Sequence, residues 1–161
     1  MQKALITAAV FSDSHGSTAR MKEAVRRLQP DVILHLGDCE HDAELLRLEF
    51  PQIPLYNVCG NCDFAPLAPE KETVQLGPVK AFLTHGHLYS VKWGRLDYIA
   101  YAAMEAGAQL ALFGHTHEAY NGEMGGVKLL NPGTAGVGRD LTYGVVQVFE
   151  NGGIACEIRE L

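Results

Sequence analysis

The sequence contains five short clusters of carboxylate, imidazole and amide side chains, and each cluster follows a run of apolar residues. In chain order the clusters are Asp13-Ser14-His15, Gly37-Asp38, Gly60-Asn61-Cys62-Asp63, Thr84-His85-Gly86-His87 and Gly114-His115-Thr116-His117. One such cluster alone is weak evidence for a metal site, because Asp-x-His and single histidines are common in loops. Five together, four of which contain a glycine that permits a sharp turn, are hard to obtain by accident.

Carboxylates and imidazoles in combination are typical ligands of transition metals. Mixed oxygen and nitrogen donors suit Mn, Fe, Co, Ni or Zn rather than Ca or Mg. A carboxylate such as that of Asp38 can bridge two cations, which lie roughly 3.5–4 Å apart in two-metal hydrolases. Only one cysteine pair, Cys59 and Cys62, has a structural zinc spacing, so we do not expect a closed cysteine-based zinc site.

The apolar pattern predicts that these clusters lie at the ends of strands. Apolar runs over residues 4–11, 32–36 and 53–58 predict buried strands, and amphipathic or short apolar patterns over 17–28 and 43–50 predict helices between them. We expect Ser17 to be the N-cap of the first helix. This alternation is typical of a parallel α/β sheet, in which ligands bind beyond the carboxyl ends of the strands.

The second half of the sequence predicts more antiparallel structure. Gly77-Pro78 and Asn151-Gly152-Gly153 are turn signals, each between two apolar segments, and each predicts a hairpin. The expected elements are strands over 73–76, 79–83, 109–113, 127–130, 143–149 and 154–158, and a helix over 93–106. We find no linker or repeat and therefore expect one domain over residues 1–161, built as a two-sheet sandwich flanked by helices.

Composition and charge restrict the class of protein. A chain of 161 residues with 47% hydrophobic and 20% charged residues is ordinary for a globular domain. The net charge of −6 and the absence of a dense Lys/Arg run argue against tight binding to duplex nucleic acid. The sequence shows no signal peptide or membrane-spanning segment, and its four cysteines do not form a disulfide scaffold. We therefore expect a cytoplasmic protein with reduced thiols.

In order, the motifs Asp-x-His, Gly-Asp, Gly-Asn-x-Asp, His-Gly and Gly-His-x-His resemble those of the calcineurin-like metallophosphoesterase superfamily. The short chain, the cysteine within Gly60-Asn61-Cys62-Asp63 and the segment Asn131-Pro132-Gly133-Thr134 look like its compact bacterial and archaeal phosphodiesterase branch, the YfcE type. The resemblance covers nearly the whole chain. It implies an α/β fold, a four-layer α/β/β/α sandwich of two mixed sheets, and a homodimer or homotetramer.

The resemblance also implies two divalent metal ions and their ligands. One ion would be held by Asp13, His15, Asp38 and His117, and the other by Asp38 as the bridge, Asn61, His85 and His115. We expect Mn²⁺, with Zn, Fe, Ni or Co as alternatives. A hydroxide bridging the two metals would attack a small phosphodiester substrate, and the metals would stabilise charge on the phosphoryl oxygens.

Cys62 occupies a position where many members of the superfamily have a histidine that is assigned to leaving-group protonation. A thiol with an ordinary pKa near 8.5 can donate a proton but is a poor hydrogen-bond donor. We include Cys62 and His87 with Asp38 and Asn61 as candidate catalytic residues. For His87 the sequence leaves open a substrate-facing position or plain exposure, and His41 could line the mouth of the site.

Three further patterns receive a structural or non-catalytic interpretation. We expect His35 to be a satisfied core histidine, and Asp63 to orient a neighbouring ligand or turn rather than to touch metal. Cys59 to Cys62 also matches Cys-x-x-Cys, but Pro66 and Pro69 follow instead of a helix, which disfavours a thiol–disulfide enzyme.

The alternative function is a non-enzymatic, metal-binding scaffold or protein-interaction subunit on the same fold, as in the related retromer subunit. In that relative the metal-binding positions have partly degenerated. Intact ligand types at all seven positions favour the enzyme.

Overall fold

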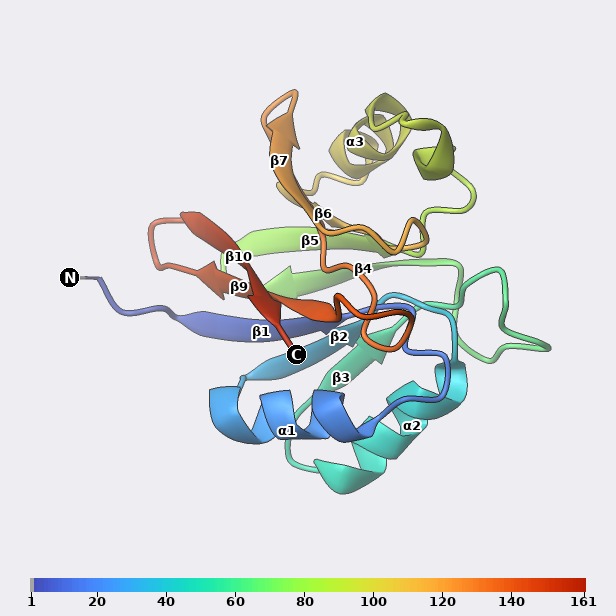
Figure 1. The fold of residues 1–161 in the computed structure, drawn as a ribbon. Helices are drawn as coiled ribbons and strands as arrows, with labels where there is room; N and C mark the ends of the chain where they lie inside the picture. The colour runs from blue at the N-terminus through green and yellow to red at the C-terminus, as the bar shows by residue number, and fades with distance from the viewer. Residues whose placement is uncertain (1) are drawn as a thin grey trace.

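The computed structural model describes residues 2–161 and contains two β-sheets packed face to face (Figure 1). The first sheet comprises β1 (Ile6–Phe11), β2 (Val32–His35), β3 (Leu55–Asn57), β9 (Thr142–Val148) and β10 (Ile154–Glu160). The second comprises β4 (Lys71–Leu76), β5 (Val79–Thr84), β6 (Leu110–Leu112), β7 (Tyr120–Met124) and β8 (Val127–Asn131). Their strand orders are β10-β9-β1-β2-β3 and β4-β5-β6-β8-β7.

Helices cover the outer faces of both sheets. Figure 1 shows α1 (Ala19–Leu28) and α2 (Glu40–Glu49) against the first sheet, and α3 (Asp97–Glu105) against the second, preceded by the short 3₁₀ helix η1 (Val91–Trp93). The predicted four-layer α/β/β/α sandwich is therefore confirmed. Within residues 2–161, every helix falls short of the length and apolar character needed to cross a membrane.

Both sheets are mixed, and their parallel strands bring the polar clusters to one edge. β1, β2 and β3 pair in parallel, as do β5, β6 and β8. The remaining pairs are antiparallel and include the two predicted hairpins, β4–β5 and β9–β10. Because parallel strands end on the same side, the clusters that follow β1, β2 and β3 lie beside one another.

Three apolar cores hold the layers together. Leu34 and Val10 pack between the two sheets, whereas the neighbouring Ile33 and Phe11 pack toward α1 and α2. A third core joins the second sheet to α3 and includes Ile99. Successive side chains of a strand point to opposite faces, so burial of both faces explains why β1 and β2 read as continuous apolar runs.

The structure corrects three local predictions. Helix α1 begins at Ala19 after Thr18, which makes no side-chain capping bond, so the assignment of Ser17 as N-cap is wrong. The helix expected over 93–106 starts only at Asp97, because Gly94 adopts φ 76° and ends the short 3₁₀ turn. Strand β7 was not expected; it is an edge strand of mostly exposed residues and lacks an apolar alternation.

Candidate metal centre

Asp13 and Asp38, which follow β1 and β2, supply two buried carboxylates with side chains 1% and 3% exposed. One oxygen of each is held by protein donors. Asp13 Oδ2 accepts hydrogen bonds from the Ser12 hydroxyl (2.5 Å) and the His115 amide (3.0 Å), and Asp38 Oδ1 accepts one from the Cys62 amide (2.9 Å). The other oxygen of Asp13, Oδ1, is buried and has no hydrogen-bond partner. Such an atom is costly unless something positive occupies the space it faces.

Imidazole nitrogens surround the free carboxylate oxygens. From Asp13 Oδ1, the Nε2 atoms of His117, His85 and His15 lie at 3.2, 3.7 and 3.8 Å. From Asp38 Oδ2, the Nε2 atoms of His85 and His15 lie at 3.3 and 3.6 Å. These atoms form two overlapping groups that could each hold a metal ion, Asp13–His15–His117 and Asp13–Asp38–His85.

His85 is oriented by its second ring nitrogen. The Nδ1 atom donates a hydrogen bond to the carbonyl oxygen of Leu36 at 2.8 Å, because a carbonyl can only accept. In the neutral ring, Nε2 therefore carries the lone pair and faces the two carboxylates. His115 Nδ1 lies 3.2 Å from this same Nε2 atom, so the two imidazoles present nitrogens to one small space.

The electrostatics of the centre match those of a cation site. Burial alone would lower the pKa of His85, but its hydrogen bond to Asp38 and the charges of Asp13 and Asp38 raise it. Burial opposes ionisation of Asp38, yet the hydrogen bond and charge of His85 and the Cys62 amide hold the pKa of Asp38 below its usual range. Burial, then the charge of His85, lowers the pKa of His115 to about 4. A bound cation at this place would take the position of a proton on His85 Nε2.

The backbone at the predicted ligands is strained. Asp13, His15, Asp38, His115 and His117 all have positive φ, between 46° and 74°. Each residue of this kind costs on the order of 1–3 kcal/mol and persists only where the surrounding structure enforces it. Five in one cluster indicate that the positions of these side chains, rather than local stability, determine the backbone here.

Two glycines allow the clusters to approach each other. A Cβ atom on Gly60 would overlap Asp38 Oδ1, and one on Gly114 would overlap the Ser12 hydroxyl that binds Asp13. Neither overlap can be relieved without moving a carboxylate from its hydrogen-bond donors. The glycines in these motifs therefore serve close approach, as well as the sharp turns expected from the sequence.

The side chain of Asn61, the amide among the predicted ligands, hydrogen-bonds to its neighbour Cys62. It is exposed, and its Nδ2 atom donates to Cys62 Sγ at 3.6 Å. The backbone on either side does reach the centre, through the Cys62 amide on Asp38.

Cys62 and His87, two of the predicted catalytic residues, differ in their surroundings. Cys62 is exposed, and desolvation followed by the charge of Asp38 raises the pKa of its thiol. His87 is half-buried with its ring 5.5 Å from that of His85, and its buried Nδ1 atom has no hydrogen-bond partner. Burial and the charge of His85 lower the pKa of His87. His87 thus lies against the imidazole cluster and is not a freely exposed residue.

The structure gives His35 and Asp63 the structural roles expected from the sequence. His35 is fully buried, with Nε2 2.9 Å from the Ser14 hydroxyl and Nδ1 accepting a hydrogen bond from the Gly37 amide, as expected of a core histidine. Asp63 accepts hydrogen bonds from four backbone amides, those of Asp38, Cys39, Glu40 and Gly60. Asp63 therefore fixes the turns that carry the ligands.

Three other residues support the centre, and of these only Thr134 belongs to a segment that the sequence motifs had included. Ser12 binds Asp13, as described above. Asp42, which is 1% exposed, accepts a hydrogen bond from the Gly16 amide at 2.7 Å and so fixes the turn after His15. The Thr134 hydroxyl donates to the Asp13 carbonyl at 2.8 Å, which brings the Asn131–Thr134 segment beside the centre. A polar residue that interrupts an apolar face is the only signal of such roles in the sequence.

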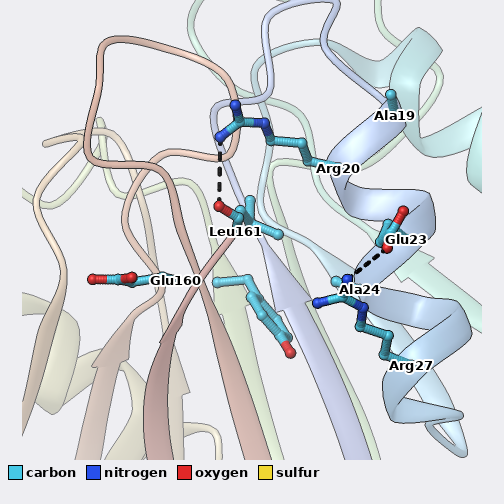
Figure 2. Close-up of a pocket in the computed structure, with 8 residues that line it drawn as sticks. Ala19, Arg20, Glu23, Ala24, Arg27, Glu160 and Leu161 are labelled. Carbon is cyan, nitrogen blue, oxygen red and sulfur yellow. Dashed lines mark hydrogen bonds and ion pairs between the residues drawn. The ribbon is translucent and has the colours of Figure 1, made fainter.

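Two hollows flank the first sheet. One, of about 710 Å³, adjoins the centre and is lined by His15, Cys62 and His41, which therefore does line the mouth of the site. The other, of about 310 Å³, lies between α1 and the end of β10 (Figure 2). There the Arg20 guanidinium donates to the Leu161 carbonyl at 3.4 Å, and no predicted site residue is among the lining residues.

Comparison with known proteins agrees with the motifs and the fold. A model of the calcineurin-like phosphoesterase superfamily domain matches residues 6–151. The chain therefore belongs to the calcineurin-like phosphoesterase superfamily. A Bacillus subtilis protein described as a probable metallophosphoesterase, YsnB, is 35% identical over 127 residues, which cover 78% of this chain and 72% of the relative.

Solved structures share the whole architecture. A predicted phosphoesterase from Streptococcus pneumoniae has a TM-score of 0.74 at 26% identity, covering 97% of this chain and 98% of that one. Vps29 from Entamoeba histolytica in complex with Zn²⁺ has a TM-score of 0.74 at 21% identity, covering 96% and 99%. A protein described as a novel archaeal phosphodiesterase has a TM-score of 0.71 at 19% identity, covering 96% and 100%. The last two likenesses show the common fold.

Proposed function

We propose that this protein is a metal-dependent phosphodiesterase with two divalent cations at the centre. The observation that carries the proposal is the buried, unpartnered Oδ1 atom of Asp13, faced by three imidazole nitrogens within 3.8 Å. Carboxylate oxygens and imidazole nitrogens in this ratio suit Mn²⁺, Zn²⁺ and their neighbours. Membership of a phosphoesterase superfamily supports the same reaction class.

The residues present fit the proposed pair of metals. Asp13, His15, Asp38 and His117 would hold one ion, and Asp38, Asn61, His85 and His115 the other. We assign the bridge to Asp38 from the family resemblance, and its Oδ2 atom lies 3.6 Å from His15 Nε2 and 3.3 Å from His85 Nε2, one imidazole of each proposed set. Asp13 Oδ1 also approaches imidazoles of both sets. When bound, the metals would lower the pKa of a water between them, supply hydroxide for attack on phosphorus, and neutralise charge on the phosphoryl oxygens.

The chain's own groups position the reaction. Leu36 holds His85 in one tautomer, and the amides of Cys62 and His115 hold one oxygen of each carboxylate. These bonds fix the ligands before substrate arrives, so little reorganisation is needed. Cys62 and His87 lie at the edge of the centre and are the candidates to meet the leaving group or a phosphoryl oxygen.

The test is hydrolysis of bis(p-nitrophenyl) phosphate by protein stripped of metal with a chelator and then reloaded with Mn²⁺, Zn²⁺ or other divalent ions. We expect stripping to abolish activity and Mn²⁺, or another transition metal, to restore it, with the diester preferred over p-nitrophenyl phosphate. Full activity in a stripped sample, with its metal content checked by elemental analysis, would refute the proposal.

A non-enzymatic scaffold is the second candidate, and the similarity of fold to Vps29 supports it. The same experiment separates the two functions. A chain that binds two metals but hydrolyses neither ester with any ion would favour the scaffold. A cytoplasmic location, a small phosphodiester substrate without tight duplex binding, and a homodimer or homotetramer stay predictions from the sequence and the family resemblance.

A further inference from the structure

The hollow beside the centre has an apolar rim that the proposed chemistry does not use. Phe64 and Leu67 line this hollow together with His15, His41 and Cys62. Their side chains are 99% and 97% exposed, the most exposed large apolar residues among those described. Scattered exposed apolar residues need no explanation, but these two lie three and six residues after the proposed ligand Asn61 and border the same space.

The loop that carries Phe64 and Leu67 is fixed at both ends. At its start, Asp63 accepts four backbone amides, as described above. At its end, the Glu40 carboxylate accepts hydrogen bonds from the amides of Leu67 (3.1 Å) and Ala68 (2.7 Å). Pro66 restricts the backbone between these anchors. A fixed loop presents its apolar side chains without the entropic cost of ordering them when a ligand binds.

The charges around the hollow select what can enter it. No lysine or arginine is among the described residues that line it. Of its acidic side chains, Glu40 and Asp63 are engaged by backbone amides, and Glu44 pairs with Arg47. A second phosphate or a carboxylate would find no cation there. An uncharged group does not need such a cation, and the rings of Phe64 and His41 are among the side chains that line the hollow.

We propose that this hollow binds an uncharged aromatic group, an aryl ring or the base of a nucleoside, in the alcohol part of a phosphate ester that the centre holds, with Phe64 and Leu67 as its specificity-determining residues. The inference rests on the proposed function of the centre. The volume of about 710 Å³ lies within the range of small-molecule sites, roughly 300–1,000 Å³, and accommodates a nucleoside. Stacking of one base on an aromatic side chain changes affinity by about 5- to 150-fold in other proteins.

Two phosphonates that cannot be hydrolysed as esters test this directly. Phenylphosphonate and methylphosphonate carry the same charged group and differ in the ring. Their affinities for the Zn²⁺-loaded protein are measured by calorimetry in the wild type, in Phe64→Ala and in Phe64→Leu. Leu48→Ala is the matched control, because Leu48 is 76% exposed on α2 and does not line the hollow.

We expect phenylphosphonate to bind at least about tenfold more tightly than methylphosphonate to the wild type and to Leu48→Ala. In Phe64→Ala this ratio should fall toward one, and in Phe64→Leu it should be intermediate. Zn²⁺ is diamagnetic, so nuclear Overhauser effects between the phenyl protons and the Leu67 methyl groups should also appear. Phe64 is fully exposed, so its replacement does not threaten folding.

The outcomes distinguish an error in the inference about the hollow from an error in the proposed function of the metal centre. If both phosphonates bind and Phe64→Ala leaves their affinity ratio unchanged, the inference about the hollow is wrong while the proposed function stands. If neither phosphonate binds a chain shown to contain metal, both are wrong. Overhauser effects to residues outside the hollow would also overturn the inference.

Discussion

Two kinds of ligand meet at the metal centre, and they differ in burial and in hydrogen bonding. The carboxylates follow β1 and β2, and two of the imidazoles follow β6. Asp13 and Asp38 are 1% and 3% exposed, and each has one oxygen held by a backbone amide. His117, in contrast, is 36% exposed, and within residues 2–161 no hydrogen bond fixes its ring. The first sheet therefore supplies fixed negative charge in a dry environment, and the second sheet supplies imidazole nitrogens, of which the outer one, on His117, is held less firmly.

The hydrogen bonds explain why the two sides differ. An ionised carboxylate removed from water needs donors, and the cheapest are backbone amides already fixed by the fold. An imidazole is neutral in its ligand form, so partial exposure costs it little. The His115 amide donates to Asp13, so the second sheet also helps to hold the charge of the first. The carboxylates should accordingly set where metal binds, and the outer imidazoles should tune how tightly.

The sharpest way to break this comparison is to remove one charge and one outer imidazole separately. Asp38→Asn removes the charge shared by both proposed metal sites, so we expect less than one metal per chain and a loss of activity of about 10³-fold or more. His117→Ala should remove a ligand of one site and leave the other metal bound. Metal content by elemental analysis and turnover of bis(p-nitrophenyl) phosphate check both. Two metals and near-normal turnover in Asp38→Asn would contradict the bridging role.

A second prediction concerns the support beneath the carboxylates. His35 is buried and neutral, and burial lowers its pKa from 6.5 to about 4. Between pH 6.5 and 4, the His35 side chain therefore binds a proton in the unfolded chain but stays neutral in the folded chain. Stability from this residue is complete above pH 6.5 and falls as the pH drops, by about 3 kcal/mol in all. His35→Asn keeps an acceptor for the Gly37 amide but cannot titrate.

Urea unfolding of both proteins from pH 7.5 to 4 measures this contribution. The wild type should lose stability more steeply than His35→Asn below pH 6.5, and the difference between the two curves isolates His35 from His85 and His115. Parallel curves would show that His35 is not kept neutral by the fold.

Most of the fold and the identity of the ligand clusters could be predicted from the sequence. Strands β1 and β2 are buried on both faces, so they leave apolar runs that end abruptly in Asp13 and Asp38. Edge strand β7 leaves no such trace, because its side chains are mostly exposed and its pairing with β8 is made by the backbone. The start of α3 was misplaced because local propensity does not show where Gly94 turns the chain.

The supports of the centre were harder to predict than its ligands. Asp42 lies just before the helix predicted over 43–50 and resembles a solvent-facing residue, yet it holds the Gly16 amide from 26 residues away. The side-chain direction of Asn61 depends on its neighbour Cys62 and is not determined by the motif. These features depend on contacts between distant segments, which patterns within one segment do not record.

A smaller effect on metal affinity is expected when the close packing around the Asp38 carboxylate is disturbed. Gly60→Ala should displace Asp38 Oδ1 from the Cys62 amide, because the added methyl group overlaps that oxygen. We expect metal affinity to fall by about 10- to 100-fold, as for other lost outer supports of a metal ligand. Gly153→Ala, in the exposed hairpin before β10, is the control and should leave affinity unchanged. Competition with a chelating dye measures both, and an unchanged affinity in Gly60→Ala would show that Asp38 tolerates displacement.

The smallest effect is expected at Cys62, whose amide holds Asp38 and whose thiol is exposed at the edge of the centre. Its raised pKa keeps the thiol protonated near neutral pH but makes it a weaker acid. Catalysis should therefore depend on a leaving group that is stable as an anion, with aryl diesters reacting far faster than alkyl diesters. A proficient general acid is worth about 10²–10⁴-fold, so its absence is visible on that scale. Cys62→Ser should change aryl rates by less than about tenfold.

The measurement is the logarithm of the rate against leaving-group pKa in the wild type, Cys62→Ser and Cys62→His. A steep dependence in the first two, reduced in Cys62→His by faster alkyl turnover, is the expected result. A flat dependence in the wild type that becomes steep in Cys62→Ser would identify Cys62 as the acid. A flat dependence that survives the serine substitution would point to His87 or His41. His87 would then be the stronger candidate, since its unpartnered Nδ1 atom already lies against the imidazole cluster.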